Sequence, residues 1–170
     1  RRGLRVVRLK GGDPGIFGRL AEETEALDAL QVPYRVLPGV SSLMAATTGT
    51  GMLLTRRGIS RGFCVMTPRQ EGGALGQIAA AEHARLPIGF FMAVSSAAEV
   101  ARQLTDDGMS PRTPVAAVFG GGSDQVRIVS GDLDNIAAHI AAAPTDLPGV
   151  LIVGDVTRFR HGAWGALEGR

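Results

Sequence analysis

The sequence offers few groups for covalent or metal chemistry. Its single cysteine, Cys64, lies in an apolar run, which excludes an internal disulfide and makes a buried, inert thiol the expectation. The three histidines, His83, His139 and His161, lack the spacing of metal ligands, so no metal site is expected. Aromatic residues make up only 5% of the chain, and no apolar run approaches the about 20 residues that a membrane helix needs.

A basic-then-apolar leader is also lacking at the start of the chain, so we expect a cytoplasmic protein without a membrane partner. What the chain does contain is an ordinary hydrophobic content of 45% and many glycines, 24 in 170 residues. A chain of this length can bury a core, either in one domain or in two small lobes. This composition indicates a soluble α/β protein.

The net charge of +2 hides an asymmetry along the chain. Residues 1–70 carry 11 basic and 5 acidic side chains, whereas residues 71–170 carry 7 and 11. Lys10 is the only lysine, and the planar guanidinium of the many arginines suits carboxylates and phosphates. The nearly neutral total and the few aromatic residues argue against a nucleic-acid partner.

The most informative stretch is Arg8-Leu9-Lys10-Gly11-Gly12-Asp13-Pro14. Residues 4–9 have the composition of a β-strand, which ends at two glycines, an acid and a proline. Open α/β sheets bind ligands at loops that follow their strands, and glycines let the backbone approach a ligand closely. On these residues alone, a ligand-binding loop and a purely structural strand-to-helix turn are equally well supported.

The first part of the chain alternates strands and helices. After the strand at residues 4–9, the pattern predicts an amphipathic helix over residues 19–30 and a short strand over residues 34–37. A second helix is predicted from Leu43 to about Thr48, with Ser41 or Ser42 as its N-cap. This alternation implies parallel strands with right-handed crossovers.

The second part of the chain has a different sequence pattern. A basic segment, Thr55-Arg56-Arg57-Gly58, is interpreted as a hinge, which gives predicted domains of residues 1–58 and 59–170. The turn at Gly120-Gly121-Gly122 predicts a hairpin and therefore a mixed sheet. The predicted strands are residues 63–67, 88–94, 115–119, 126–129 and 150–153, and the predicted helices are residues 75–84, 95–107 and 133–143.

The run from Val7 to Glu23, with its Gly11-Gly12-Asp13-Pro14 and Ile16-Phe17-Gly18-Arg19 segments, resembles the tetrapyrrole (corrin/porphyrin) methyltransferases, most closely those acting on uroporphyrinogen-III. The resemblance continues to the end of the chain. The later segments in the family's order are Val36-x-Pro38-Gly39-Val40-Ser41-Ser42, Leu54-Thr55-x-Arg57, Phe91-Met92, Pro114-Val115-Ala116, Val129-x-Gly131-x-Leu133 and Leu151-Ile152-Val153-Gly154.

The resemblance implies an α/β, two-lobed tetrapyrrole methyltransferase fold, with a truncated parallel-sheet first lobe and a mixed-sheet second lobe. It implies S-adenosylmethionine-dependent C-methylation of uroporphyrinogen-III toward precorrin-2, in sirohaem and cobalamin biosynthesis, by a homodimer that binds the cofactor between its lobes. Family members normally begin well before the opening strand. We therefore expect the catalytic residues in an amino-terminal part that this chain lacks, and little turnover by this chain alone.

The resemblance also implies site residues. Arg57 matches a family position and is the candidate for binding the substrate's carboxylates. The implied contacts to S-adenosylmethionine or S-adenosylhomocysteine are Gly11, Gly12, Asp13, Ile16, Ser41, Ser42, Met92 and Gly121.

Simpler interpretations stand beside these. Met92 on its own suits a core filler, Gly120 to Gly122 suit a hairpin turn, and Arg57 suits a solvated face. At the level of the protein, the alternatives are a methyltransferase for a later corrin precursor and a non-catalytic fragment that binds the cofactor or dimerises.

Overall fold

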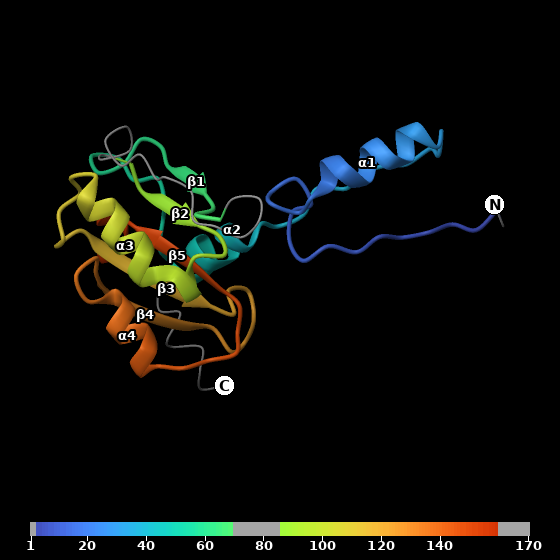
Figure 1. Cartoon of the computed structure of the whole chain (residues 1–170). Coiled ribbons are helices and arrows are strands. Elements are labelled where there is room, and N and C mark those ends of the chain that lie inside the picture. Colours follow the sequence, from blue (N-terminus) through green and yellow to red (C-terminus); the bar gives the residue numbers. More distant parts are fainter. Residues whose placement is uncertain (1–2, 70–85, 160–170) are drawn as a thin grey trace. The chain divides into compact units, whose positions relative to one another are not determined.

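The computed structural model describes residues 3–69 and 86–159. The chain divides into two compact units, residues 1–42 and residues 43–170. Figure 1 labels the elements of both units, which are described separately below. No helix among the described residues is long and apolar enough to cross a membrane.

Helix α1, Leu20–Ala29, is the regular element of the first unit. It begins after Arg19, which has a left-handed backbone (φ 54), and carries Glu22 and Glu23 in its first turn, where acids oppose the positive end of the helix dipole. It ends in a Schellman motif, in which left-handed Gln31 donates to the carbonyl of Asp28 and Val32 donates to the carbonyl of Leu27. The helix predicted over residues 19–30 is confirmed.

The two strands predicted for this unit, residues 4–9 and 34–37, are wrong for the described structure, as is the parallel pairing inferred from them. Residues 4–9 form the long unpaired segment seen in Figure 1. Strand hydrogen bonds require a neighbouring strand, and no described segment pairs with either stretch. Their apolar side chains are accordingly exposed, for example Val6 at 85%.

The second unit is built on a five-stranded mixed sheet in the order β1-β2-β5-β3-β4. Only β1 and β2 pair in parallel, and every other neighbouring pair is antiparallel. The strands are β1 (Cys64–Met66), β2 (Ile88–Phe90), β3 (Pro114–Phe119), β4 (Arg127–Asp132) and β5 (Gly149–Val153). The expected α/β class and the mixed sheet of the second part are both confirmed.

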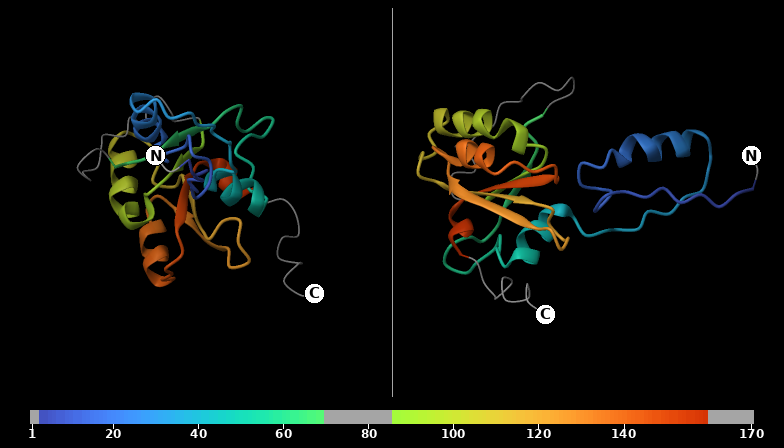
Figure 2. Two further views of the ribbon diagram at one scale, coloured as in Figure 1. Left: turned by 90° about the vertical axis from the view of Figure 1, so that its right-hand side faces the viewer. Right: turned by 90° about the horizontal axis from the view of Figure 1, so that it is seen from below.

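Helices cover both faces of this sheet (Figure 2). Helices α3 (Ala97–Asp106) and α4 (Ile136–Ala142) pack on one face with Val115, Ala117 and Phe119 of β3. The opposite face of β3, with Ala116 and Val118, packs with α2 (Ser42–Thr47) and the 3₁₀ helix η4 (Asp155–Arg158). All six residues of β3 are buried, as expected for an inner strand between two helical layers.

Several boundaries differ from the predicted ones. Strand β2 stops at Phe90 because Met92 turns into a left-handed backbone (φ 56). Helix α3 is preceded by the 3₁₀ helix η3 (Val94–Ser96), in which the Ser96 hydroxyl donates to the Ala93 carbonyl. Helix α4 starts at Ile136 rather than at residue 133, because the Asn135 side chain accepts the Asp132 N–H and forms a turn first. The helix predicted over residues 75–84 lies outside the described residues.

Residues 43–54, which open the second unit, pack into its core. Helix α2 is followed by the 3₁₀ helix η1 (Thr48–Thr50), and Met52 and Leu54 are buried in the same apolar cluster as Leu43 of α2. This packing agrees with the boundary between the two compact units, which lies between residues 42 and 43. The domain boundary expected from the sequence, between residues 58 and 59, stays a prediction.

Candidate functional site

Two loops of the first unit meet through glycine. Gly12 has a positive φ of 100°, and a Cβ there would lie 3.4 Å from the Val40 carbonyl oxygen and 3.5 Å from the Ser42 nitrogen. In return, a Cβ on Gly39 would lie 2.7 Å from the Gly12 carbonyl oxygen. The loop at residues 11–13 is therefore in main-chain contact with residues 39–42. The contact requires glycine at position 39, and the positive φ favours glycine at position 12. Three predicted contacts, Gly12, Ser41 and Ser42, come together here, and Gly11 precedes them in the same loop.

Asp13 ties these loops together. Its Oδ2 accepts the Gly39 N–H at 2.9 Å, and its Oδ1 accepts the Gly15 N–H at 2.8 Å. Both carboxylate oxygens thus bind main-chain donors of this chain. The sequence predicts Asp13 as a cofactor contact, and the structure assigns it an additional task, the joining of two loops.

Gly11 differs from its neighbour. It has no positive φ, a Cβ built on it would meet nothing within 4 Å, and its main chain forms no hydrogen bond within the described residues. The fold as described therefore gives no reason for glycine at this position. An open main chain beside the Asp13 tie is what a ligand-binding glycine requires.

The far side of the loop is strained. The Ile16 N–H donates to the Asp13 carbonyl at 3.3 Å, and the Ile16 side chain is 42% exposed. The next residue, Phe17, has a left-handed backbone (φ 52), which is uncommon for a bulky side chain. A Cβ on Gly18 would clash with the Pro14 carbonyl oxygen, so glycine is required there too. Such strain is typical of loops whose shape serves a function.

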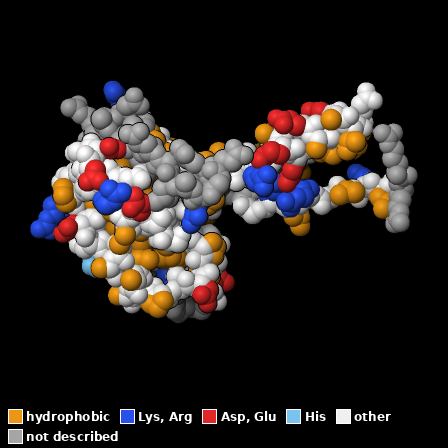
Figure 3. All heavy atoms as spheres, in the orientation of Figure 1, with side chains coloured by type: hydrophobic (Ala, Val, Ile, Leu, Met, Phe, Trp, Pro, Cys, Tyr) orange, Lys and Arg blue, Asp and Glu red, His pale blue; other side chains and the backbone are white. Residues whose placement is uncertain are grey.

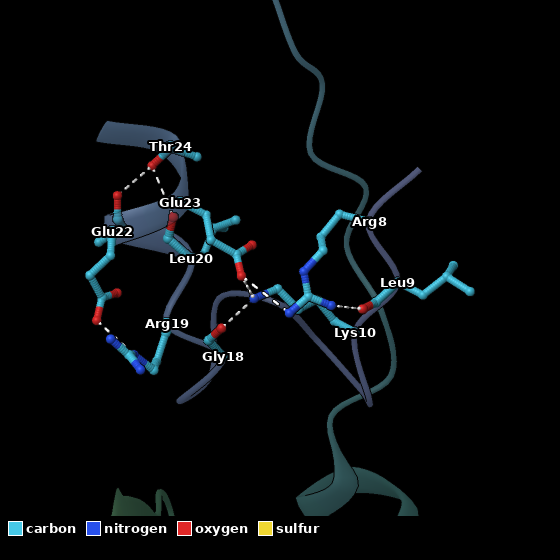
Figure 4. A network of polar contacts seen from close by, with 10 residues as sticks. Arg8, Leu9, Lys10, Gly18, Arg19, Leu20, Glu22, Glu23 and Thr24 are labelled. Atoms are coloured by element: carbon cyan, nitrogen blue, oxygen red, sulfur yellow. Dashed lines mark hydrogen bonds and ion pairs between the residues drawn. The ribbon is translucent and has the colours of Figure 1, made fainter. Parts of the chain in front are cut away.

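A network of polar contacts closes the loop at its base (Figure 4). The Lys10 ammonium donates to the Gly18 carbonyl and to Glu23 Oε1, both at 2.6 Å, and Arg8 approaches the same carboxylate oxygen at 3.3 Å. The Lys10 hydrogen bond, followed by the charges of Lys10 and Arg8, holds the pKa of Glu23 below its usual value. In Figure 3 the basic side chains of this region lie beside the acidic ones of α1.

Sequence reasoning missed this network. The sequence singles out Lys10 only as the one lysine of the chain. A usable signal was present, because Lys10 is the only lysine of the chain and is followed by an acidic first helical turn.

Two predicted cofactor contacts lie in the second unit. Met92, 50% exposed, follows β2 in a left-handed turn, where Arg69 donates from Nε to its carbonyl at 3.5 Å and from a terminal nitrogen to Ser95 Oγ at 3.2 Å. An exposed Met92 does not fill the core. Gly121 lies against α2, since a Cβ on it would be 2.9 Å from both the Cα and the nitrogen of Ala46. Close helix packing alone therefore accounts for glycine at position 121.

Arg57 lies in a tight turn of the second unit. A bridge between Arg56 and Ser60 closes the turn, and the Arg56 guanidinium lies 4.2 Å from the centre of the Phe159 ring. Arg57 itself is exposed. Its guanidinium is accessible to a carboxylate ligand. A solvated surface arginine would be equally exposed, so exposure does not distinguish the two interpretations.

Other candidate groups are less informative. Cys64 of β1 is half-buried, and this burial raises the pKa of its thiol, which opposes reactivity. His139 places Nδ1 2.9 Å from the Ser130 carbonyl oxygen. Within residues 3–69 and 86–159 no cluster of histidine, cysteine and acidic side chains could hold a metal ion, and His83 and His161 lie outside the described residues.

Comparison with known proteins gives this geometry a context. The family of tetrapyrrole (corrin/porphyrin) methylases matches residues 1–137. The chain belongs to this family. It is 39% identical to a siroheme synthase of Edwardsiella ictaluri over 165 residues, which are 94% of this chain and 34% of that protein. A siroheme synthase of a Psychrobacter species is 36% identical over 158 residues, 92% of this chain and 32% of that protein. The chain spans about a third of the length of these curated relatives.

Solved structures agree with the family. The native form of uroporphyrin III C-methyl transferase from Thermus thermophilus superimposes with a TM-score of 0.78 at 35% identity, covering 90% of this chain and 64% of that one. Its complex with S-adenosylhomocysteine gives the same TM-score and identity and covers 67% of that chain. A cobalt precorrin-4 methyltransferase, at 19% identity and a TM-score of 0.75, shares the fold. The tetrapyrrole methylase fold is thereby shown for this chain.

Proposed function

We propose that this chain binds S-adenosylmethionine and serves the C-methylation of uroporphyrinogen-III toward precorrin-2. The observation that carries the proposal is the loop at Gly11, Gly12 and Asp13, whose main chain is open at Gly11 and whose shape is fixed by the Asp13 tie to Gly39. The resemblance and the structural relative bound to S-adenosylhomocysteine support this choice of ligand.

The residues of the chain fit such a ligand. In the first unit, the open Gly11 main chain can exchange hydrogen bonds with polar groups, and the half-exposed Ile16 side chain offers apolar surface. In the second unit, the half-exposed Met92 side chain offers apolar surface as well. We also assign contacts with the cofactor to Gly12, Ser41 and Ser42 of the first unit and to Gly121 of the second. Arg57, with its exposed guanidinium, is assigned to the carboxylates of the tetrapyrrole.

The proposed reaction asks little of individual side chains. When bound, S-adenosylmethionine supplies an electrophilic methyl group on a sulfonium, and transfer to a pyrrole carbon is an in-line displacement. The protein then contributes mainly alignment, since a misplaced loop weakens the reaction even where no catalytic side chain is lost. In this chain the alignment rests on Asp13, whose two oxygens fix the loop at Gly15 and Gly39. A homodimer and a cytoplasmic location are further parts of the proposal, carried by the resemblance.

The test is methyl transfer from S-adenosylmethionine carrying a labelled methyl group, catalysed by a protein of the relatives' full length that contains this chain, with uroporphyrinogen-III and a later corrin precursor offered separately. The proposal expects label in uroporphyrinogen-III and none in the later precursor. The opposite preference would assign a later corrin precursor instead. Cofactor binding without transfer to either compound would establish the non-catalytic alternative, and no binding of S-adenosylhomocysteine would overturn the cofactor assignment itself.

A further inference from the structure

The base of the ligand-binding loop holds an ion pair that the proposed function does not use. Lys10 comes directly before Gly11, and its side chain is only 14% exposed, compared with 68% for Arg8. Its ammonium group binds Glu23 of α1 and the carbonyl of Gly18, each at 2.6 Å. A lysine that is this well covered needs such partners, because an unpaired ammonium away from water is costly.

These contacts connect the two ends of one loop. Lys10 lies at the start of the loop and Gly18 at its end, where the chain enters α1. The residues between them include the predicted cofactor contacts Gly11, Gly12, Asp13 and Ile16. Figure 4 shows the Lys10 side chain crossing from one end of the loop to the other. The loop is therefore fixed twice, by Lys10 at its base and by Asp13 at Gly39.

The same contacts argue against direct binding of a ligand by Lys10. An ammonium group has three donors, and two of them bind Gly18 and Glu23. A substrate carboxylate could reach only the third donor, on a side chain that is 14% exposed, and it would lie beside the negative charge of Glu23. The exposed Arg57 has no such competition from the hydrogen bonds that the structure shows.

We propose that the Lys10–Glu23 ion pair is the positioning device that holds residues 11–18 in their ligand-binding shape, and that neither side chain contacts the ligand. This inference rests on the proposed function, because the affinity that it controls is that for S-adenosylhomocysteine. Lys10 and Glu23 act as a unit in it, so removing either one has the effect of removing both.

The binding test uses Lys10→Met, Glu23→Gln and the double variant, with the Kd for S-adenosylhomocysteine measured by calorimetry. Each single variant is expected to bind about tenfold more weakly, since a lost hydrogen bond to a charged group has about this effect. The double variant should be no weaker than the weaker single variant. Lys10→Arg, which keeps the charge without the compact ammonium, should lie between wild type and Lys10→Met.

Arg102→Met is the matched control, because it removes ion pairs to Glu99 and Asp106 on the exposed face of α3. Its Kd should stay within about twofold of wild type, as expected for surface ion pairs. An unchanged Kd in Lys10→Met would overturn the inference. Losses that add in the double variant would also overturn it, because they would show that the two side chains act independently.

A second measurement separates this inference from the proposed function. Amide hydrogen exchange at Gly15, Ile16 and Gly39, whose N–H groups bond to Asp13, should be faster in Lys10→Met and Glu23→Gln, even without a ligand. Exchange at Met109, which bonds to Leu104 in the second unit, should not change. If wild type fails to bind S-adenosylhomocysteine, the proposed function fails. Unchanged exchange at the three loop amides would overturn the positioning role itself.

Discussion

At the scale of single residues, glycine occupies the positions of the candidate site for different physical reasons. Gly12 has a positive φ and Gly121 a close helix neighbour, so the fold accounts for both. Gly11 has neither, so the described fold does not account for glycine there, and contact with the cofactor is our proposal for this position. The resemblance implies contact with the cofactor at all three positions equally, because it does not distinguish backbone strain, close packing and ligand contact. Only the distances from each glycine to its neighbours separate them.

Gly121→Ala is expected to destabilise the second unit by about 1–3 kcal/mol, as overpacking does. Its new Cβ would lie 2.9 Å from main-chain atoms of Ala46, which cannot move without shifting α2. The matched control is Gly49→Ala, which meets nothing within 4 Å and has no positive φ. Denaturant unfolding measures both variants. Equal free energies of unfolding for the two would contradict the packing explanation.

Asp13→Asn is expected to loosen the two loops. An amide offers one acceptor oxygen, so its NH₂ group must face either the Gly15 N–H or the Gly39 N–H, donor against donor. Amide exchange at one of these two glycines should therefore become faster, and S-adenosylhomocysteine should bind more weakly. Unchanged exchange at both would mean that the carboxylate does not fix the loops.

Acid should release the Lys10–Glu23 pair. Lys10 lowers the pKa of Glu23 below the ordinary value of 4.5. The pair therefore contributes fully to the stability of the fold above pH 4.5, and this stabilisation is lost as the pH falls through the lowered pKa. An NMR titration of the Glu23 carboxyl carbon measures this directly. Lys10→Met should move the pKa back toward its usual value more than Arg8→Met does, since the Lys10 hydrogen bond is the largest cause of the shift. A larger effect of Arg8→Met would contradict the assignment.

At the scale of elements, α2 is held by small residues on its partners. Leu43 of α2 is buried above Gly89 of β2, where a Cβ would lie 2.6 Å from Leu43 Cδ1. Ala46, one turn later, lies against Gly121. The helix therefore depends on glycines from two separate segments for its close approach to the sheet.

A double-mutant cycle tests this packing. Gly89→Ala should destabilise the unit, because the new methyl group competes with Leu43 for the same space. Leu43→Ala should cost about 2–5 kcal/mol by leaving a cavity. The two changes together should cost less than their sum, since each removes the conflict that the other creates. Strict additivity of the measured free energies of unfolding would contradict this arrangement.

The elements predicted best from the sequence are those whose partners lie close by. Helix α1 was predicted within one residue at either end, because its acidic first turn and the Gln31-Val32-Pro33 sequence that ends it are local signals. The predicted strand at residues 88–94 is four residues longer than β2, since the side chains of Phe91 and Met92 do not indicate a left-handed turn. Residues 4–9 have strand composition but form no strand, because pairing depends on a neighbour and not on composition.

At the scale of the whole molecule, family membership and the mixed sheet of the second unit are established, whereas the use of the site is the proposal. The candidate site residues come from the family resemblance, and their contact with a cofactor stays a prediction. The tasks of Asp13 and Lys10 could not be predicted from the sequence, since they depend on hydrogen bonds to main-chain groups up to 26 residues away. The proposal unites both results in one loop that is open at Gly11 and fixed on either side of it.

The most direct test is a calorimetric titration of S-adenosylhomocysteine into the wild-type protein and into Gly11→Ala. A methyl group at Gly11 meets nothing in the fold, so the melting midpoint of the variant should not fall. If the open main chain of Gly11 contacts the cofactor, wild type binds and Gly11→Ala binds at least about tenfold more weakly, while Gly49→Ala binds as wild type does. No binding by wild type, or equal binding by Gly11→Ala, would contradict the account.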